Sequence, residues 1–429
     1  MDTLYYSRSF AIGTQHRNTS LCLLEWVEAF VLAICPILQH YNGLVTEAGT
    51  ELLLIAFPFI CLKLLKKKRF FVKPLIPLAL YALYISTIHG FTFFVFCREC
   101  LLLVYFIAVL NNGIAVEKYF KVAKAVGITA FWLLLLQYLL YYFFHYHLQL
   151  IPTGRLLESA NQWIGLAETG RISVTGAQMS IYRPSAFFLE PSHLSIYCTP
   201  VLVLNLLSSV LCRKKIIESI MITLAMVLST SGMGIMISAA VWGIYIAFYY
   251  GTYEKEGESF SNRNKRINAL FYLIGIAILI LGMYLSVGVF RSAVNRIFVS
   301  AGSGSGNAIQ GRTSTGIRLL QTLSGTALFI GKGNTLRIAD WNVSGFFYTV
   351  FQFGWIGCAL YYWFYIKSLV QIKREYFWLA LMIIILSFFT VHTFAAFYRM
   401  FFICLILGGY LRSEKLRGQK IVNIVRIIH

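Results

Sequence analysis

Long apolar stretches separated by short polar segments make up most of this 429-residue chain. A helix needs roughly 20 apolar residues to cross the hydrocarbon core of a bilayer, and about twelve stretches approach that length. They lie near residues 21–40, 44–65, 75–91, 94–112, 126–148, 193–211, 216–229, 233–250, 267–290, 346–366, 377–393 and 397–411. The pattern predicts an all-α integral membrane protein in which residues 1–429 form a single polytopic domain. Charged residues interrupt two of the stretches, at Glu25 and Glu28 and at Arg98 and Glu99.

The composition agrees with this class, because 58% of the residues are hydrophobic and only 13% are charged. These fractions exclude an ordinary soluble protein. The formal net charge of +20 fits the excess of lysine and arginine in cytoplasmic loops, so no nucleic-acid partner is expected. Most of the nine cysteines lie inside apolar stretches, where they act as small hydrophobic side chains. Neither a disulfide framework nor a redox role for Cys97 and Cys100 is expected.

The basic clusters predict the orientation of the chain in the membrane. With twelve spans, all of them fall on the same side as both termini, and the positive-inside rule makes this side cytoplasmic. They lie at residues 66–69, 118–124, 213–215, 263–266 and 373–374 and in a cytoplasmic tail at 412–429. The first apolar stretch begins near residue 21 without a cleavage pattern, so it is expected to stay in the membrane.

Two long loops are predicted on the opposite, outer side, at residues 151–191 and 291–345. Long loops in a compact protein often carry function. The first loop has balanced charge, whereas the second carries six basic residues against one acidic residue, Asp340. Basic charge on the outer side departs from the topology rule, so the second loop is expected to meet an anionic partner.

Several kinds of chemistry are excluded by what the sequence lacks. Asp2 and Asp340 are the only aspartates, so no D-x-D site for a metal-bound nucleotide sugar can form. The Gly331-Lys332-Gly333 segment lacks the spacing of a phosphate-binding P-loop, and neither an H-E-x-x-H nor a G-x-S-x-G motif occurs. We therefore expect a reaction that needs neither ATP nor a metal, with no cofactor.

The first candidate site is R-P-S-A-F-F-L-E-P-S-H, from Arg183 to His193. Proline suits the first turn of a helix and forces the preceding residue to be extended, so a span should begin at Pro191. The electropositive helix end and Arg183 predict a seat for a phosphate, and Glu190 can accept a proton from a hydroxyl. Alternatively, Glu190 and His193 cap the helix and Arg183 pairs with Glu190.

The second candidate is G-R-T-S-T-G-I-R in the basic outer loop, with Gly331-Lys332-Gly333-Asn334 downstream. Two arginines, Arg312 and Arg318, can clamp a diphosphate through bidentate hydrogen bonds. The alternative is an amphipathic surface helix with its arginines reaching towards water. Its apolar side would be formed by Ile317, Leu319, Leu320 and Leu323.

The third candidate is V-H-T-F-A-A-F-Y-R near the outer end of the last two spans. His392 and Arg399 are seven positions apart, which places them on one face of a continuous helix. A short hairpin can interrupt that helix, and a lone histidine in such a place is also compatible with a purely structural role.

Together these features resemble the bacterial O-antigen polymerase and O-antigen ligase family of integral-membrane glycan enzymes. The resemblance covers about residues 182–399 and includes a serine-rich hairpin, S-T-S-G, at Ser229 to Gly232. The hairpin departs from the family pattern, because it has Ser231-Gly232-Met233 where a basic residue often follows the serine. The resemblance implies a metal-independent, inverting glycosyltransferase of the membrane-embedded C type. It would join repeat units on undecaprenyl diphosphate into O-antigen, capsule or exopolysaccharide on the outer side of the bacterial inner membrane.

The resemblance also implies roles for the candidate residues. Arg183, Arg312 and Arg318 would bind the diphosphates, and Glu190 or His392 would act as the base or orient the substrate. Supporting roles would fall to His193, Lys332 and Arg399. The implied partners are lipid-linked glycans, the bilayer, and a flippase and chain-length regulator of the same pathway. A ligase of the same superfamily remains an alternative, and so does a flippase or other transporter, although the sequence lacks the two similar halves that transporters often show.

Overall fold

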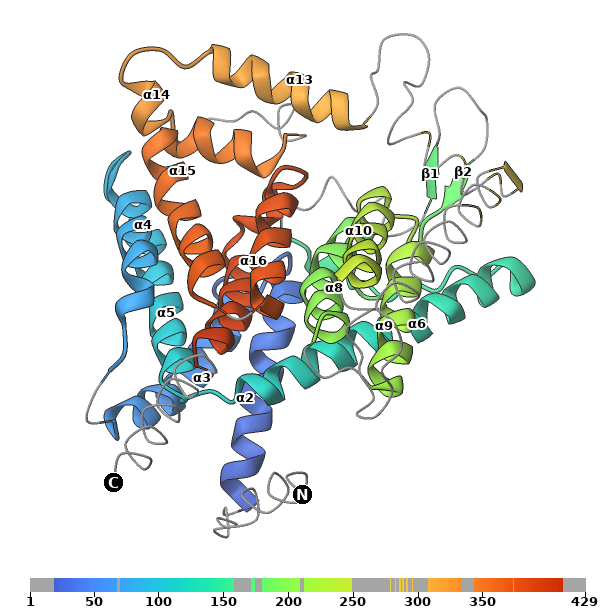
Figure 1. Ribbon diagram of the computed structural model, residues 1–429, viewed down its shortest axis with the longest axis horizontal. Coiled ribbons are helices and arrows are strands. Elements are labelled where there is room, and N and C mark those ends of the chain that lie inside the picture. Colours follow the sequence, from blue (N-terminus) through green and yellow to red (C-terminus); the bar gives the residue numbers. More distant parts are fainter. Residues whose placement is uncertain are drawn as a thin grey trace, which may run out of the picture.

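The computed structural model describes a bundle of helices with one small β-hairpin (Figure 1). The described residues are 19–67, 70–157, 171–173, 180–208, 212–248, 308–333, 343–372 and 374–411, with seven single positions between 278 and 295. The helices are α2 (Thr19–Leu38), α3 (Ala48–Leu65), α4 (Ile76–Thr87), α5 (Phe93–Leu110), α6 (Val116–Phe144), α8 (Pro191–Leu206), α9 (Arg213–Leu228), α10 (Gly232–Phe248), α13 (Ala308–Gln321), α14 (Ala327–Ile330), α15 (Gly345–Gln371), α16 (Arg374–Ser387) and a last helix, Ala396–Leu411. Strands β1 (Arg171–Ser173) and β2 (Ser180–Tyr182) pair antiparallel.

The predicted helical fold is confirmed, and the apolar helices are consistent with a membrane protein. Three helices, α3, α5 and α6, are long and apolar enough to cross a membrane, and α10, Glu375–Ser387 and Ala396–Leu411 are shorter apolar helices. A helix lies at every predicted stretch except residues 267–290, which lie almost wholly outside the described residues. Some helices are shorter than predicted. The 12 residues of α4 extend over only about 18 Å, so α4 alone does not reach across a hydrocarbon core of about 30 Å.

Two helices lie at the centre of the bundle, α8 and Ala396–Leu411. Nearly every side chain of both is buried, as expected for helices that are apolar on all sides. The rings of Tyr197 and Phe401 stack with centroids 4.6 Å apart, and the Tyr197 hydroxyl donates to the Ala33 carbonyl of α2 at 2.9 Å. These two contacts join α8 to the helix Ala396–Leu411 and to α2.

Polar side chains on α8 bond to its own backbone. The Ser195 hydroxyl donates to the Pro191 carbonyl at 3.1 Å, and the Thr199 hydroxyl donates to the Ser195 carbonyl at 2.7 Å. In an apolar surrounding each polar group needs an internal partner, so these bonds allow the hydroxyls to be buried. The turn between α9 and α10, which contains the S-T-S-G segment, lies nearby, because Gly234 closely approaches the Ser195 side chain.

Helix α15 is broken at Gly354, which has a φ of +67°. The break leaves carbonyls without partners inside the helix, and neighbouring segments supply them. The amides of Lys332 and Gly333 donate to the Phe351 and Gln352 carbonyls at 2.8 and 3.0 Å, and the Tyr84 hydroxyl donates to the Phe353 carbonyl at 2.9 Å. The predicted span 346–366 is therefore two helical segments joined at a fixed angle.

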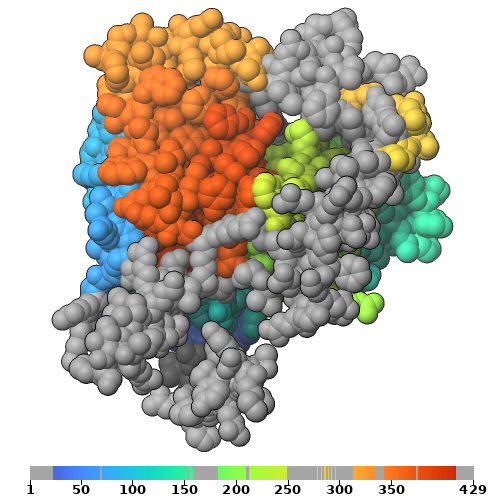
Figure 2. Space-filling model, in the orientation of Figure 1, coloured from blue at the N-terminus to red at the C-terminus, as the bar shows by residue number. Residues whose placement is uncertain are grey.

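Helix α13 packs along α15 at the top of the molecule, where Figure 2 shows its surface. Leu319 and Leu323 are buried against α15, and Leu320 is packed beside them. Ile317 is instead 47% exposed, so the amphipathic helix predicted from the sequence forms with one of its four apolar residues facing outwards. Gly316, Leu319, Leu320 and Leu323 follow the i, i+3, i+4, i+7 spacing of one helix face, on which Gly316 lies against the Phe347 ring, and Ile317 falls outside this face.

Ion pairs hold the opposite end of the bundle together. Lys63 pairs with Glu28 at 2.5 Å, Lys118 with Glu25 at 2.8 Å and Lys124 with Glu218 at 2.6 Å. These pairs explain why two glutamates lie inside the first predicted span. Glu28 faces Lys63 of α3, and Glu25 faces Lys118 of α6. All three lysines come from the side predicted to be cytoplasmic.

We predict that Gly354→Ala destabilises the protein by more than about 1 kcal/mol, because the positive φ strains a side chain and the new methyl group meets the Phe329 carbonyl. Thermal unfolding of the detergent-purified protein measures the effect. Gly243→Ala in α10 is the control, since a methyl group there meets nothing within 4 Å. Equal melting temperatures for both variants would show that the break in α15 is not a fixed feature.

Candidate active site

The segment before α8 folds back onto α6. The Ala186 amide donates to the Gln137 side-chain oxygen at 3.0 Å, and the Ser185 hydroxyl donates to the Phe188 carbonyl at 2.6 Å. Ala186 has a φ of +53°, a conformation that a side chain adopts only when surrounding contacts hold it. These contacts fix the path of the chain from Arg183 to Glu190.

Helix α8 begins at Pro191, as predicted, and Glu190 before it is extended with φ −142° and ψ 148°. The Glu190 side chain makes no capping hydrogen bond, so its carboxylate is not used to cap α8. The first turn offers less to an anion than predicted, because Pro191 has no N–H and the His193 amide bonds the Glu190 carbonyl at 2.9 Å. A phosphate bound here would depend mainly on side-chain charge.

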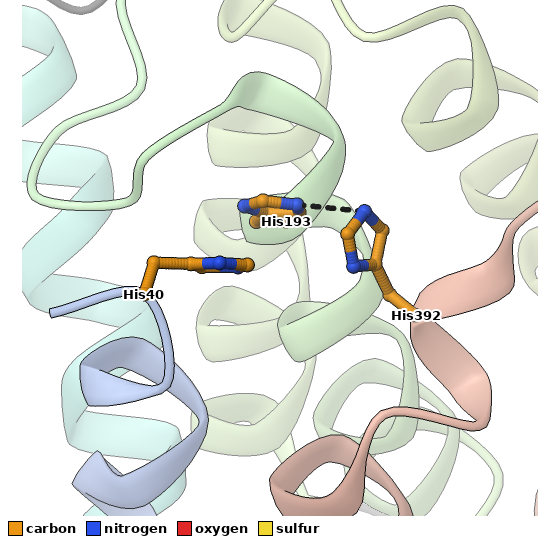
Figure 3. Close-up of side chains that lie close together, drawn as sticks. All are labelled: His40, His193 and His392. Carbon is orange, nitrogen blue, oxygen red and sulfur yellow. Dashed lines mark hydrogen bonds between the residues drawn. The ribbon is translucent and has the colours of Figure 1, made fainter. Parts of the chain in front are cut away.

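Three imidazoles from distant parts of the chain meet at this end of α8 (Figure 3). His40 follows α2, His193 lies in the first turn of α8, and His392 lies in a 3₁₀ turn, η5 (Val391–Thr393), after α16. The His193 and His392 Nε2 atoms are 2.9 Å apart, although 199 positions separate the residues. The His40 ring stacks on that of His193, with centroids 4.6 Å apart and planes 9° apart. The hydrogen bond, the stacked pair, and edge contacts of the His392 ring with both other rings hold the cluster together.

The groups around the cluster favour neutral imidazoles. The amide nitrogen of Gln39 lies 2.9 Å from the His40 Nε2 atom, and since this amide only donates, that ring nitrogen accepts. Burial, and after it the neighbouring His392, lower the pKa of His40 to about 3. The Glu190 Oε2 atom lies 3.9 Å from the His193 Nε2 atom. The cluster thus places a carboxylate beside neutral rings that can accept a proton.

Arg399 lies apart from this cluster. Its guanidinium donates to both carboxylate oxygens of Glu99 on α5 and lies 5.3 Å from the centre of the Tyr81 ring. Both partners of the pair are buried, with side chains 4% and 6% exposed. Because η5 separates His392 from the helix Ala396–Leu411, the two residues do not share one continuous helix face, which corrects the simple spacing argument. Arg399 serves here as the partner of a buried carboxylate.

The remaining predicted residues lie in different surroundings. Arg183 is buried and within electrostatic reach of the Tyr138 hydroxyl on α6. Arg318 is exposed on α13, and the Lys332 ammonium donates to the Thr322 carbonyl at 2.6 Å. The side chain of Arg312 lies outside the described part of the chain. The structure therefore brings Glu190, His193 and His392 together, and places Arg318 and Lys332 on the outer layer formed by α13 to α15.

His40 is the member of the cluster that sequence reasoning missed. The signal for it was weak, because one histidine at the end of the first apolar stretch looks like an ordinary interfacial residue. Its neighbour Gln39 carried a hint, since two polar residues end a stretch that is otherwise apolar. Only the packing of α2 against α8 shows that this end faces the other two histidines.

A cluster of this kind can move a proton. A neutral imidazole at hydrogen-bonding distance from a second one can accept a proton from a hydroxyl and share the charge with its neighbour and a nearby carboxylate. Burial disfavours a charged ring, so the neighbouring imidazole and the Glu190 carboxylate are needed to stabilise the transferred proton. The arrangement suits a reaction that deprotonates an alcohol.

Comparison with known proteins adds no further constraint. No model of a known protein family matches this chain. The search of curated proteins likewise finds no match.

Removal of Arg399 should destabilise the protein strongly. We predict that Arg399→Met costs about 3–5 kcal/mol, because Glu99 is left buried without its partner, and that the double variant Glu99→Gln, Arg399→Met recovers most of the loss. The measurement is the yield and melting temperature of purified protein. A fully stable single variant would contradict the structural role of Arg399.

Proposed function

We propose that this protein is a polysaccharide polymerase that joins lipid-linked oligosaccharide repeat units on the outer face of a bacterial inner membrane. The observation that carries the proposal is the convergence of Glu190, His193 and His392. A carboxylate and two imidazoles come together at the start of α8. This combination is what deprotonation of an acceptor sugar hydroxyl requires.

The proposed reaction is a direct displacement at the anomeric carbon of the donor glycan. His392 accepts the proton of the acceptor hydroxyl, and the resulting oxygen nucleophile forms the new glycosidic bond. The bond between the anomeric carbon and the diphosphate breaks, and undecaprenyl diphosphate leaves with the electron pair. His193 shares the proton taken up by His392, and Glu190 stabilises the resulting positive charge. The broken diphosphate linkage supplies the driving force, so the step uses neither ATP nor a metal.

The leaving diphosphate needs positive charge on the same side. Arg183 lies on the segment that leads into α8, and Arg318 is exposed on α13 in the basic outer loop. Arginine binds phosphate oxygens in a bidentate manner, so we assign the diphosphates of donor and acceptor to Arg183, Arg312 and Arg318. The positive charge of this loop would also concentrate the anionic lipid-linked substrates near the cluster.

The same residues favour an enzyme over a transporter. A flippase needs binding groups along a path through the membrane, whereas the buried Arg399 inside the bundle is held in an ion pair with Glu99. The histidine cluster is formed by residues at the ends of helices, since His40 follows α2, His193 lies in the first turn of α8 and His392 follows α16. A carrier of lipid-linked oligosaccharide would also not elongate its cargo.

The direct test is elongation of undecaprenyl-diphosphate-linked repeat units by the purified protein in detergent. We predict that the wild type makes long chains, and that His392→Gln and Glu190→Gln slow elongation by about 10²–10⁴-fold. Glu117→Gln, at the start of α6 on the opposite end, is the matched control and should elongate at the wild-type rate. Chain length is read on a gel after labelling of the glycan.

The outcomes separate the candidate functions. Complete absence of elongation by well-folded wild-type protein contradicts the polymerase, and transfer of finished chains to a lipid acceptor under the same conditions identifies a ligase. Movement of repeat units across a vesicle membrane without elongation identifies a flippase. Elongation that survives both site substitutions would place the chemistry elsewhere in the protein.

The arginine assignments make a separate prediction. Arg318→Ala and Arg312→Ala should raise the substrate concentration for half-maximal elongation about tenfold or more, because each loses a charge-assisted contact worth about 1.5–3 kcal/mol. Arg213→Ala, on the side predicted to be cytoplasmic, is the control. Unchanged substrate dependence in both outer-loop variants would remove the arginines from the binding site.

A further inference from the structure

The three histidines have the arrangement of a ligand set as well as that of a proton relay. One donor nitrogen of each of His40, His193 and His392 lies within 4.8 Å of the others. His193 is 1% exposed, and the other two are half-buried. Each residue comes from a separate segment whose backbone is fixed by helix packing. Side chains held on three rigid elements form a more precise site than side chains on one loop.

The chemical state of the donors fits metal binding. A metal bonds to the lone pair of a neutral imidazole. At His40 the Nε2 lone pair accepts a hydrogen bond from the Gln39 amide at 2.9 Å, and a metal bound to this atom would replace that hydrogen bond. The buried Nδ1 atom of His193 has no hydrogen-bond partner among the residues that the structure describes. A buried ring nitrogen without a partner is costly, so a ligand that engages the ring stabilises this arrangement.

A carboxylate is available for a further position. The Glu190 Oε2 atom lies 3.9 Å from the His193 Nε2 atom, and its side chain does not cap α8. Three imidazoles and one carboxylate are typical of borderline transition metals such as Zn²⁺, Co²⁺ and Ni²⁺, whereas Mg²⁺ and Ca²⁺ prefer oxygen ligands.

We propose that His40, His193 and His392, with Glu190, form a binding site for a divalent transition metal at the outer end of the bundle. Donor atoms in a tetrahedral site with bonds of about 2.0–2.1 Å are about 3.3 Å apart. The three histidine donor nitrogens all lie within 4.8 Å of one another, and the His40 and His193 rings are stacked. The proposed site therefore requires the His40 side chain to rotate out of the stack so that its nitrogen comes closer to the other two.

Metal binding has a consequence that rests on the proposed function. A metal bound to His392 occupies the lone pair that would accept the hydroxyl proton. Transition metals should therefore inhibit elongation, although the reaction itself needs none.

The test is titration of Co²⁺ into full-length protein that was purified without a histidine tag and treated with a chelator. Four-coordinate Co²⁺ has a visible absorption band, and we expect this band to saturate at about one Co²⁺ per chain and to disappear when Zn²⁺ displaces it. Loss of even an outer-shell partner costs 10–100-fold in affinity. His40→Gln and His392→Gln should therefore each weaken binding by about 100-fold or more.

His145→Asn is the matched control, because this exposed histidine lies outside the cluster. The backbone of His145 is left-handed, a conformation that asparagine tolerates. It should bind Co²⁺ like the wild type. Size-exclusion elution and melting temperature show whether each variant is folded. If one of the two cluster variants does not fold, the other still tests the proposal. The proposal is overturned if wild-type protein shows no such band, or if the band persists unchanged in both cluster variants.

The elongation assay distinguishes failure of the metal-site proposal from failure of the proposed polymerase function. Co²⁺ binding without any elongation supports the metal site and contradicts the polymerase. Elongation without Co²⁺ binding supports the polymerase and contradicts the metal site. If both are observed, added Zn²⁺ should suppress elongation in the wild type, and a chelator should restore it.

Discussion

Every polar group buried in the apolar interior of this protein must find its partner inside the protein, and much of the structure follows from that constraint. The hydroxyls of α8 return to the backbone of their own helix, and the broken turn of α15 gives its carbonyls to amides after α14. Glu99 is buried because Arg399 covers both of its oxygens. The histidine cluster obeys the same rule, since its rings bond and stack with one another.

The position of the cluster is a result of topology. Helices α2 and α16 end where α8 begins, so residues that follow or start these helices meet at one end of the bundle. The central contact of Tyr197 with Phe401 fixes α8 relative to the last helix, and the Tyr398 hydroxyl donates to the His193 carbonyl at 3.2 Å. Small changes deep in the bundle are therefore able to alter the distances between the imidazoles.

The pattern of apolar stretches and the position of proline predicted much of the fold. Apolar stretches located the helices, and proline chemistry located the start of α8 at Pro191. Glu190 and His193 were recognised because charge at the start of a span is unusual, and His392 was recognised separately, in the segment at the outer end of the last two spans. Sequence did not reveal the partner of each group. His40 needed the packing of α2 on α8, and the Arg399–Glu99 pair joins residues 300 positions apart, a contact that no local pattern encodes.

The central claim is that this cluster deprotonates a sugar hydroxyl during transfer from a lipid diphosphate. The most direct measurement is a single-turnover time course in which purified protein is mixed with one labelled lipid-linked repeat unit and excess unlabelled acceptor. The account predicts a dimeric product that forms rapidly with wild-type protein and at a small fraction of that rate with His392→Gln, while substrate binding is retained. Equal rates of product formation in the two proteins would contradict it.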